Sequence, residues 1–257
     1  MNKKEIKASY RARKRQLRSS DKQGKKALKK EYIDTLFDYY KQSGRAAYDP
    51  PKRSVLEEIG NSVTHGIGAV FAVVAFILML ISSERALEYV SASVYFLGQA
   101  VMFTVSCLYH AFRHGTAVKR LFRRFDSSSI YLLIGATFAP ILLCYVGGVY
   151  GTVFFIIQWS VIVTGITLVG VFGPSRLRFI HIPLYLLLGW CGLIILPLMI
   201  RRGDFGFLWF ILGGGIIYSL GVIPFAIKAR VSHFIWHFFV LAGAVVQWIG
   251  VYTCIYL

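Results

Sequence analysis

Long apolar runs dominate the chain from about residue 66 to its end, and they are separated by short polar connections. A run of about 17 to 25 apolar residues is the length that an α-helix needs to cross a bilayer. Strands of a membrane barrel would alternate apolar and polar residues, and these runs do not alternate. The pattern predicts an all-α integral membrane protein with seven transmembrane helices, at 66–82, 90–110, 126–146, 150–172, 179–200, 207–227 and 233–257.

Charge divides the chain into two parts. The sequence is 56% hydrophobic but carries 29 Lys and Arg residues against 12 Asp and Glu, and 17 of the basic residues precede residue 65. Adjacent prolines at Pro50 and Pro51 interrupt any helix between the two parts. We therefore expect a basic cytoplasmic tail at 1–52 and a membrane domain at 53–257.

The distribution of basic residues also predicts the orientation, because cytoplasmic loops of membrane proteins collect Lys and Arg. If the N-terminus lies inside, 26 basic residues fall on the cytoplasmic side and only three, Arg85, Arg201 and Arg202, fall outside. We expect the N-terminus in the cytoplasm and the C-terminus outside. A cleavable signal peptide is not expected, because the first apolar run begins late and no small-residue cleavage site follows it.

The basic tail is expected to contact anionic lipid headgroups, where each Lys or Arg near the surface contributes about 1 kcal/mol. Segment 32–40 carries apolar residues at partly helical spacing and suits a short interfacial helix. A nucleic-acid partner is not expected, since no folded soluble module accompanies the tail to position it on phosphates. The four cysteines lie in predicted spans without the spacing of a metal or disulfide framework.

Polar residues converge at one end of the predicted bundle. The positions lie just before the first span, at the end of the second and at the start of the third and seventh, which are all cytoplasmic ends in the predicted orientation. They are Glu58, Asn61, His65, Ser106, His110, Asp126, His233 and His237. Ionisable residues in spanning helices are costly and rare, so their gathering at one depth indicates a functional site.

Three imidazoles in this group suit a metal ion. His233 and His237 lie one turn apart on one helix face, and His110 adds a third ligand from another span. Zinc is commonly held by three protein ligands with a fourth position open to water when the site is catalytic. We therefore expect zinc bound by His110, His233 and His237.

The remaining polar residues suit supporting chemistry. Asp126 is placed to act as a general base towards a water molecule, and Ser106 to orient the substrate or to stabilise negative charge on it. Glu58, Asn61 and His65 share one helix face. We expect them to contact the metal ligands and orient them without binding the metal themselves.

Each residue also has a plainer interpretation. Histidines at helix ends interact with headgroups or with the helix dipole, which is how we interpret His114 and His181. Asp126 with the serines after it suits a helix N-cap. Ser106 suits a hydrogen bond to a neighbouring helix.

Four segments carry a resemblance to a known family: EIGNSVTHG at 58–66, SCLYHAF at 106–112, RFDSSSIY at 124–131 and HFIWHFFVLAG at 233–243. At these residues the chain resembles the hemolysin III family, the bacterial branch of the progestin and adipoQ receptor superfamily that includes the adiponectin receptors. The segments follow the family's order across the whole membrane domain.

The resemblance implies a seven-helix protein of a bacterial cell membrane, with an inside N-terminus and a zinc site near the inner leaflet. It assigns the ligands to His110, His233 and His237, and it places Asp126 near zinc through water. The superfamily includes alkaline ceramidases, which implies a lipid amide as substrate class. The chain departs from bacterial relatives at Ser127 and Gln247, where they often carry histidine.

Three functions follow as hypotheses. The first is a zinc-dependent hydrolase of lipid amides or esters, similar to a ceramidase. The second is a non-enzymatic sensor, receptor or envelope-homeostasis protein with structural zinc. A pore-forming cytolysin is disfavoured, because a polytopic protein inserted during synthesis has no evident water-soluble form.

Overall fold

The computed structural model describes residues 3–17, 21–48, 50–227, 229 and 231–257. Contacts between residues divide the chain into two units, Met1–Asp49 and Pro50–Leu257. Each unit is described by itself.

The first unit is a helical hairpin. Tyr10 stacks on Tyr32 with ring centroids 4.2 Å apart, and Arg13 donates a hydrogen bond of 2.5 Å to Glu31. This hydrogen bond raises the pKa of Arg13 and lowers the pKa of Glu31. The segment 32–40, expected as a separate short helix, is part of one longer helix. The two helices are α1 (Lys3–Gln16) and α2 (Lys22–Tyr48).

The second unit is a bundle of long apolar helices. Its elements are α3 (Val55–Ile81), α4 (Ala86–Ala111), α5 (Ala117–Pro140) with a π-helical turn (Ile141–Val146), α6 (Gly148–Phe172), α7 (Arg178–Trp190) with a 3₁₀ turn (Cys191–Ile195), α8 (Leu196–Arg202), α9 (Phe205–Ala226), and α10 (Ser232–Val251) with a π-helical end (Tyr252–Tyr256). Within the described residues, seven helical segments are long and apolar enough to cross a membrane. The prediction of seven such helices is confirmed, and the orientation in the membrane stays a prediction.

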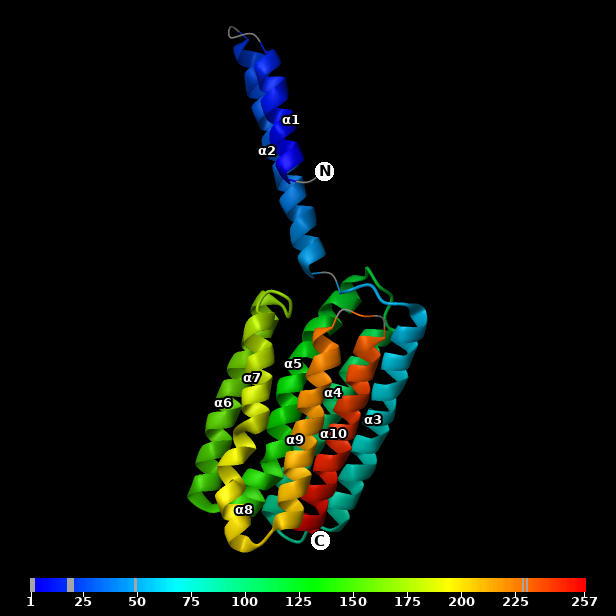
Figure 1. Cartoon of the computed structure of the whole chain (residues 1–257), viewed down its shortest axis with the longest axis vertical. Coiled ribbons are helices and arrows are strands. Elements are labelled where there is room, and N and C mark those ends of the chain that lie inside the picture. The colour runs from blue at the N-terminus through cyan, green and yellow to red at the C-terminus, as the bar shows by residue number, and fades with distance from the viewer. Residues whose placement is uncertain (1–2, 18–20, 49, 228, 230) are drawn as a thin grey trace. The chain divides into compact units, whose positions relative to one another are not determined.

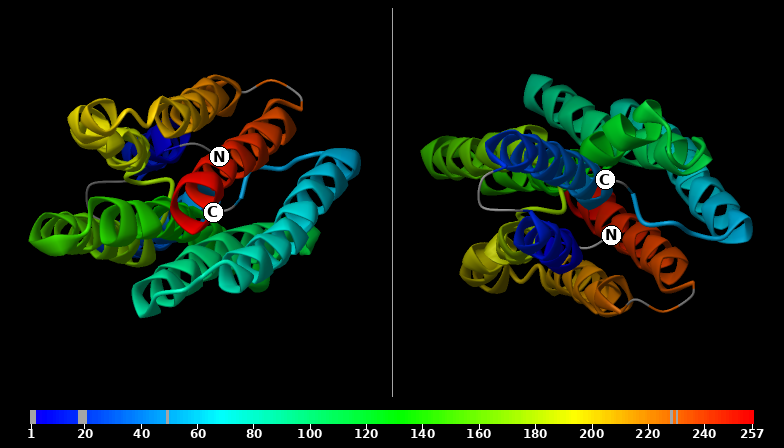
Figure 2. Two further views of the ribbon diagram at one scale, coloured as in Figure 1. Left: turned by 90° about the horizontal axis from the view of Figure 1, so that it is seen from below. Right: turned by 90° about the horizontal axis from the view of Figure 1, so that it is seen from above.

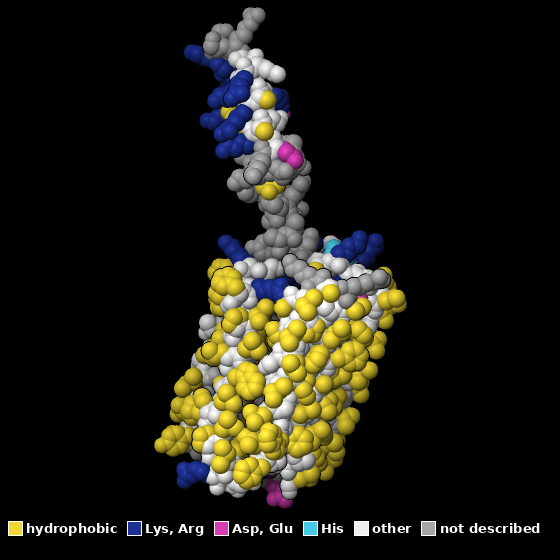
Figure 3. Space-filling model, in the orientation of Figure 1, with side chains coloured by type: hydrophobic (Ala, Val, Ile, Leu, Met, Phe, Trp, Pro, Cys, Tyr) yellow, Lys and Arg dark blue, Asp and Glu magenta, His cyan; other side chains and the backbone are white. Residues whose placement is uncertain are grey.

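The helices of this bundle run side by side along one direction (Figure 1). The end-on views in Figure 2 show α10 between α3 and α9, and it contacts both. Apolar side chains cover the visible sides of the bundle, whereas Lys and Arg gather near its ends (Figure 3). This is the surface that a lipid environment requires of a helical bundle.

Two helices begin well before the apolar runs that predicted them: α3 begins at residue 55 rather than 66, and α5 at residue 117 rather than 126. Ser54 caps α3 by accepting a hydrogen bond from the backbone N–H of Glu57, and Thr116 caps α5 by accepting one from that of Lys119. Hydropathy detects only the apolar part of each helix, while the capping side chains extend it through polar turns. Asp126 therefore lies inside α5, and its interpretation as an N-cap is wrong.

Close helix contact depends on a small residue in α4. A Cβ atom added at Gly98 would lie 2.2 Å from the Cβ of Ala136 and 2.8 Å from the carbonyl oxygen of Leu132, both on α5. Only glycine allows these two backbones to approach so closely, which is how small residues strengthen helix packing in lipid.

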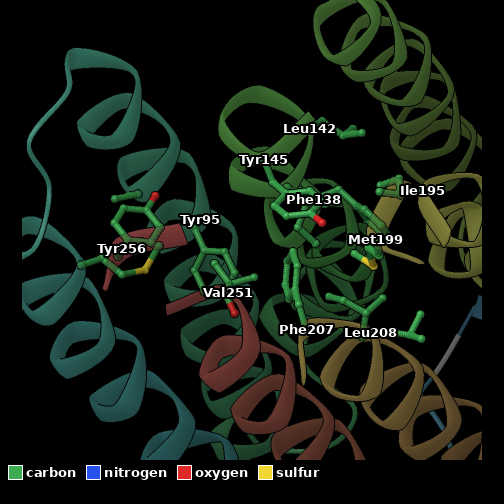
Figure 4. Close-up of a cluster of buried hydrophobic side chains, with 14 residues drawn as sticks. Tyr95, Phe138, Leu142, Tyr145, Ile195, Met199, Phe207, Leu208, Val251 and Tyr256 are labelled. Atoms are coloured by element: carbon green, nitrogen blue, oxygen red, sulfur yellow. The ribbon is translucent and has the colours of Figure 1, made fainter. Parts of the chain in front are cut away.

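A cluster of buried apolar side chains packs between the helices of the bundle (Figure 4). It includes Tyr95 of α4, Phe138 of α5, Phe207 of α9 and Val251 of α10, each at most 2% exposed. This cluster joins elements that are distant in sequence.

Candidate metal centre

Two helices bring three histidines together. His110 lies in the last turn of α4, and His233 and His237 lie in the first turns of α10. One ring nitrogen of each histidine lies within 4.8 Å of those of the other two. His110 and His237 are each only 2% exposed, while His233 is partly exposed. The set could hold a metal ion.

The spacing on α10 fits such an ion. The Nε2 atoms of His233 and His237 lie 3.3 Å apart. Two nitrogens bound to one tetrahedral zinc ion at about 2.0 to 2.1 Å lie roughly 3.3 to 3.4 Å from each other. The i,i+4 spacing on a regular helix therefore already sets two imidazoles at a chelating distance.

The ring of His110 is held from α3. Its Nδ1 lies 2.5 Å from Oε2 of Glu58 and 3.3 Å from the amide nitrogen of Asn61. A carboxylate only accepts hydrogen bonds, so Nδ1 carries the hydrogen and donates it to Glu58. The other nitrogen, Nε2, is buried and has no hydrogen-bond partner in the described part of the chain. In the neutral ring, this nitrogen has the lone pair that a metal would bind.

A lysine that the sequence did not single out completes this arrangement. Lys119 of α5 is 1% exposed and donates a hydrogen bond of 2.8 Å to Oε1 of Glu58. In the predicted topology it lies in the connection between the spans at 90–110 and 126–146. Its spacing of seven residues from Asp126, which places both on one helix face, was the signal that could have identified it.

Asp126 and Ser106 lie on the wall of one cavity with His233 and His237. The cavity has a volume of about 140 Å³, and side chains of α3, α4, α5, α7, α9 and α10 line it. Phe138 belongs both to this lining and to the apolar cluster of Figure 4, so the cavity borders that cluster. A carboxylate, a hydroxyl and imidazoles thus face a space that is otherwise mostly apolar.

His65 of α3 stacks on one of the three histidines. Its ring lies 3.8 Å from that of His237, centroid to centroid, and meets Phe103 edge to face at 5.2 Å. Neither of its buried nitrogens has a hydrogen-bond partner among the described residues. Ser127 and Gln247, the two departures noted above, also line the cavity.

The remaining histidines lie apart from the three. His181 is 3% exposed, and its Nδ1 lies 2.9 Å from the hydroxyl of Tyr131, so its interpretation as an interfacial residue is wrong. The hydroxyl of a residue 50 positions earlier in the chain gives it a partner that sequence spacing could not reveal. His114 is exposed, and its Nε2 lies 2.9 Å from the carbonyl oxygen of Pro50. The four cysteines are free.

Comparison with known proteins finds relatives that align with most of this chain. Hemolysin-3 of Bacillus cereus is 36% identical over 195 residues, which cover 74% of this chain and 88% of the relative. The hemolysin-3 homolog of Bacillus subtilis (strain 168) is 33% identical over 196 residues, with coverage of 74% and 91%. The human monocyte to macrophage differentiation factor is 27% identical over 211 residues, covering 80% and 87%.

The protein family described as Haemolysin-III related matches residues 53–248, which include α3 to α9, most of α10 and all three histidines of the candidate centre. The chain is therefore a multi-pass membrane protein that belongs to the haemolysin-III-related family.

Proposed function

We propose that this protein is a metal-dependent hydrolase that cleaves an amide or ester bond of a membrane lipid. The observation that carries the proposal is the placement of three imidazoles, the Asp126 carboxylate and an apolar cavity within one bundle. Zinc is the metal that this donor set suits best, because it accepts three imidazoles and retains a position for a substrate or water.

When bound, the metal supplies a Lewis acid and makes a water molecule acidic enough to react near neutral pH. The Asp126 carboxylate would accept a proton from the attacking water as its oxygen bonds to the scissile carbonyl carbon. It would give this proton to the leaving nitrogen or oxygen as the C–N or C–O bond breaks. The Ser106 hydroxyl, which lies beside Asp126, orients the scissile carbonyl. His110, His233 and His237 would hold the metal, and His233 and His237 would present it to the cavity that they line.

The apolar lining of the cavity and its position beside a second pocket favour a substrate with an acyl chain. A second pocket between α7 and α9 shares Leu186, Trp190, Ser219 and Val222 with the first. Its lining also includes Ile223, which is 56% exposed on the side of the bundle. An acyl chain in the bilayer would reach the cavity between these two helices, with its carbonyl group near the histidines.

The end of the bundle that carries the three histidines is expected to be cytoplasmic, because most Lys and Arg residues of the sequence fall on that side. The proposed reaction would therefore take place at the inner leaflet. The Lys and Arg residues of the first unit would then contact anionic headgroups of the same leaflet. Membrane lipids are thus both the substrate and the surroundings of the proposed enzyme.

The test is a hydrolysis assay with full-length, zinc-loaded protein in nanodiscs that contain ceramide or phospholipid, with fatty-acid release followed by mass spectrometry. Asp126→Asn should retain zinc and lose roughly 10²- to 10⁴-fold of the turnover, as expected for a general base. Zinc-loaded wild-type protein that leaves every lipid amide and ester intact would contradict the proposal.

A non-enzymatic sensor or receptor with structural zinc is the second candidate. The burial of His110 and His237 favours it, because a metal there would tie α4 to α10 with little contact to solvent. X-ray absorption spectroscopy separates the two, since four protein ligands indicate a structural ion and a light exchangeable ligand indicates an open position. Cytolysis, suggested by the name of the Bacillus relatives, is not proposed, because this polytopic chain has no evident water-soluble form.

A further inference from the structure

A buried lysine lies next to the candidate metal centre, in contact with Glu58 and His110. The side chain of Lys119 is 1% exposed, at a depth in the bundle where an unpaired ammonium group is costly. Such a group persists only if it is paired and hydrogen-bonded. What it pairs with therefore indicates its role.

Lys119 contacts two neighbouring helices at once. Its Nζ donates a hydrogen bond of 2.8 Å to Glu58 on α3 and one of 3.4 Å to the backbone carbonyl of His110 on α4. It also lies 5.0 Å from the centre of the Tyr109 ring. The last carbonyls of a helix have no partner within the helix and attract cations, so α4 provides a favourable position for this ammonium.

Glu58 links the lysine to the metal ligand. Its Oε1 accepts from Lys119, while its Oε2 accepts from Nδ1 of His110 at 2.5 Å. Each carboxylate oxygen thus has a separate partner, and the plane of the carboxylate is fixed by both. Glu58 is the acceptor that keeps the hydrogen of His110 on Nδ1.

We propose that Lys119 is a positioning residue for the metal ligand His110, acting through Glu58. The ammonium holds the carboxylate so that Oε2 faces Nδ1, and the Nε2 lone pair then points away from Glu58 towards His233 and His237. Without Lys119, the carboxylate is free to turn and the imidazole loses its fixed orientation. This inference rests on the metal centre of the proposed function and adds a residue outside its ligand set.

The test measures cobalt(II) and zinc binding by titration calorimetry on full-length protein in detergent. Lys119→Met retains the length of the side chain without its charge and should weaken metal binding by about 10-fold, within the range for residues that orient ligands. Lys119→Gln serves as a second variant if Lys119→Met does not fold, and the same loss is expected. Arg124→Met is the control with unchanged affinity, since Arg124 lies on the same helix but donates to the carbonyl oxygen of Gly170.

A double-mutant cycle separates positioning from general stability. If Lys119 acts through Glu58, adding Lys119→Met to Glu58→Gln weakens cobalt binding no further than Glu58→Gln alone. Fully additive losses would overturn the inference. The visible absorption bands of bound cobalt should also change in Lys119→Met, which a merely structural role would not produce.

The outcomes distinguish this inference from the proposed function. Wild-type protein that binds no metal overturns both. If the wild type binds cobalt and a folded Lys119→Met or Lys119→Gln variant binds it with the same affinity and spectrum, only the role of Lys119 is overturned.

Discussion

The Nε2 atoms of His233 and His237 face each other at 3.3 Å from successive turns of α10. Two neutral imidazoles share at most one hydrogen bond across this gap, whereas one metal ion binds both nitrogens at once. Among the described residues, the Nε2 of His110 has no hydrogen-bond partner. His110 is the third histidine of the candidate metal centre.

We expect elemental analysis of purified wild-type protein to find close to one zinc per chain. Removing one of three ligands should abolish retention, so His110→Ala, His233→Ala and His237→Ala should each lack zinc. His114→Ala is the matched control and should retain it, because His114 is exposed and contacts the Pro50 carbonyl. Zinc retained in all three ligand variants would refute the site.

Metal removal should lower thermal stability. A ligand that binds only the folded state at 100 times its dissociation constant adds about 2.7 kcal/mol to the free energy of unfolding. A chelator should therefore lower the melting temperature of the wild type, and added zinc should restore it. His237→Ala should show no response to either treatment, as followed by the fluorescence of a thiol-reactive dye or by circular dichroism.

Packing of α4 on α5 should fail when Gly98 gains a methyl group. The added Cβ would meet Ala136 and the Leu132 carbonyl, and both contacts involve atoms that move only with the helix. Gly98→Ala should lower the free energy of unfolding by about 1 to 3 kcal/mol in thermal or denaturant unfolding. Gly170→Ala in α6 is the control, because its added Cβ meets no atom within 4 Å. This variant should keep the stability of the wild type or gain up to about 1 kcal/mol, since alanine favours the helix.

The hydrogen bond between Tyr131 and His181 should be structural and independent of the metal. Tyr131→Phe leaves Nδ1 of the buried His181 without its partner, which costs about 1 to 3 kcal/mol. The variant should unfold at a lower temperature and retain as much zinc as the wild type. Loss of zinc would show that this pair is coupled to the centre.

The orientation can be tested by thiol labelling on intact cells. In a chain whose four native cysteines are replaced by alanine, Arg201→Cys should react with a membrane-impermeant maleimide, because Arg201 is expected outside. Lys26→Cys in the first unit should react only after the membrane is opened. The reverse pattern would place the metal centre at the outer leaflet.

The local pattern of residues determined the class of fold. Runs of apolar side chains long enough to cross a bilayer force helices, because lipid offers backbone groups no other partner. The i,i+4 spacing of His233 and His237 depends only on the regular turn of a helix, so their approach followed from the sequence as well.

Tertiary structure alone decided which distant residues meet. Lys119 is a loop cation by sequence but a buried partner of Glu58, and His181 is an isolated histidine by sequence but a partner of Tyr131. Both contacts depend on how separate helices pack, which is set by side-chain volumes and by close approaches such as that at Gly98. The sequence pattern shows on which face of its own helix a residue lies. Which other helix packs against that face depends on the packing of the whole bundle.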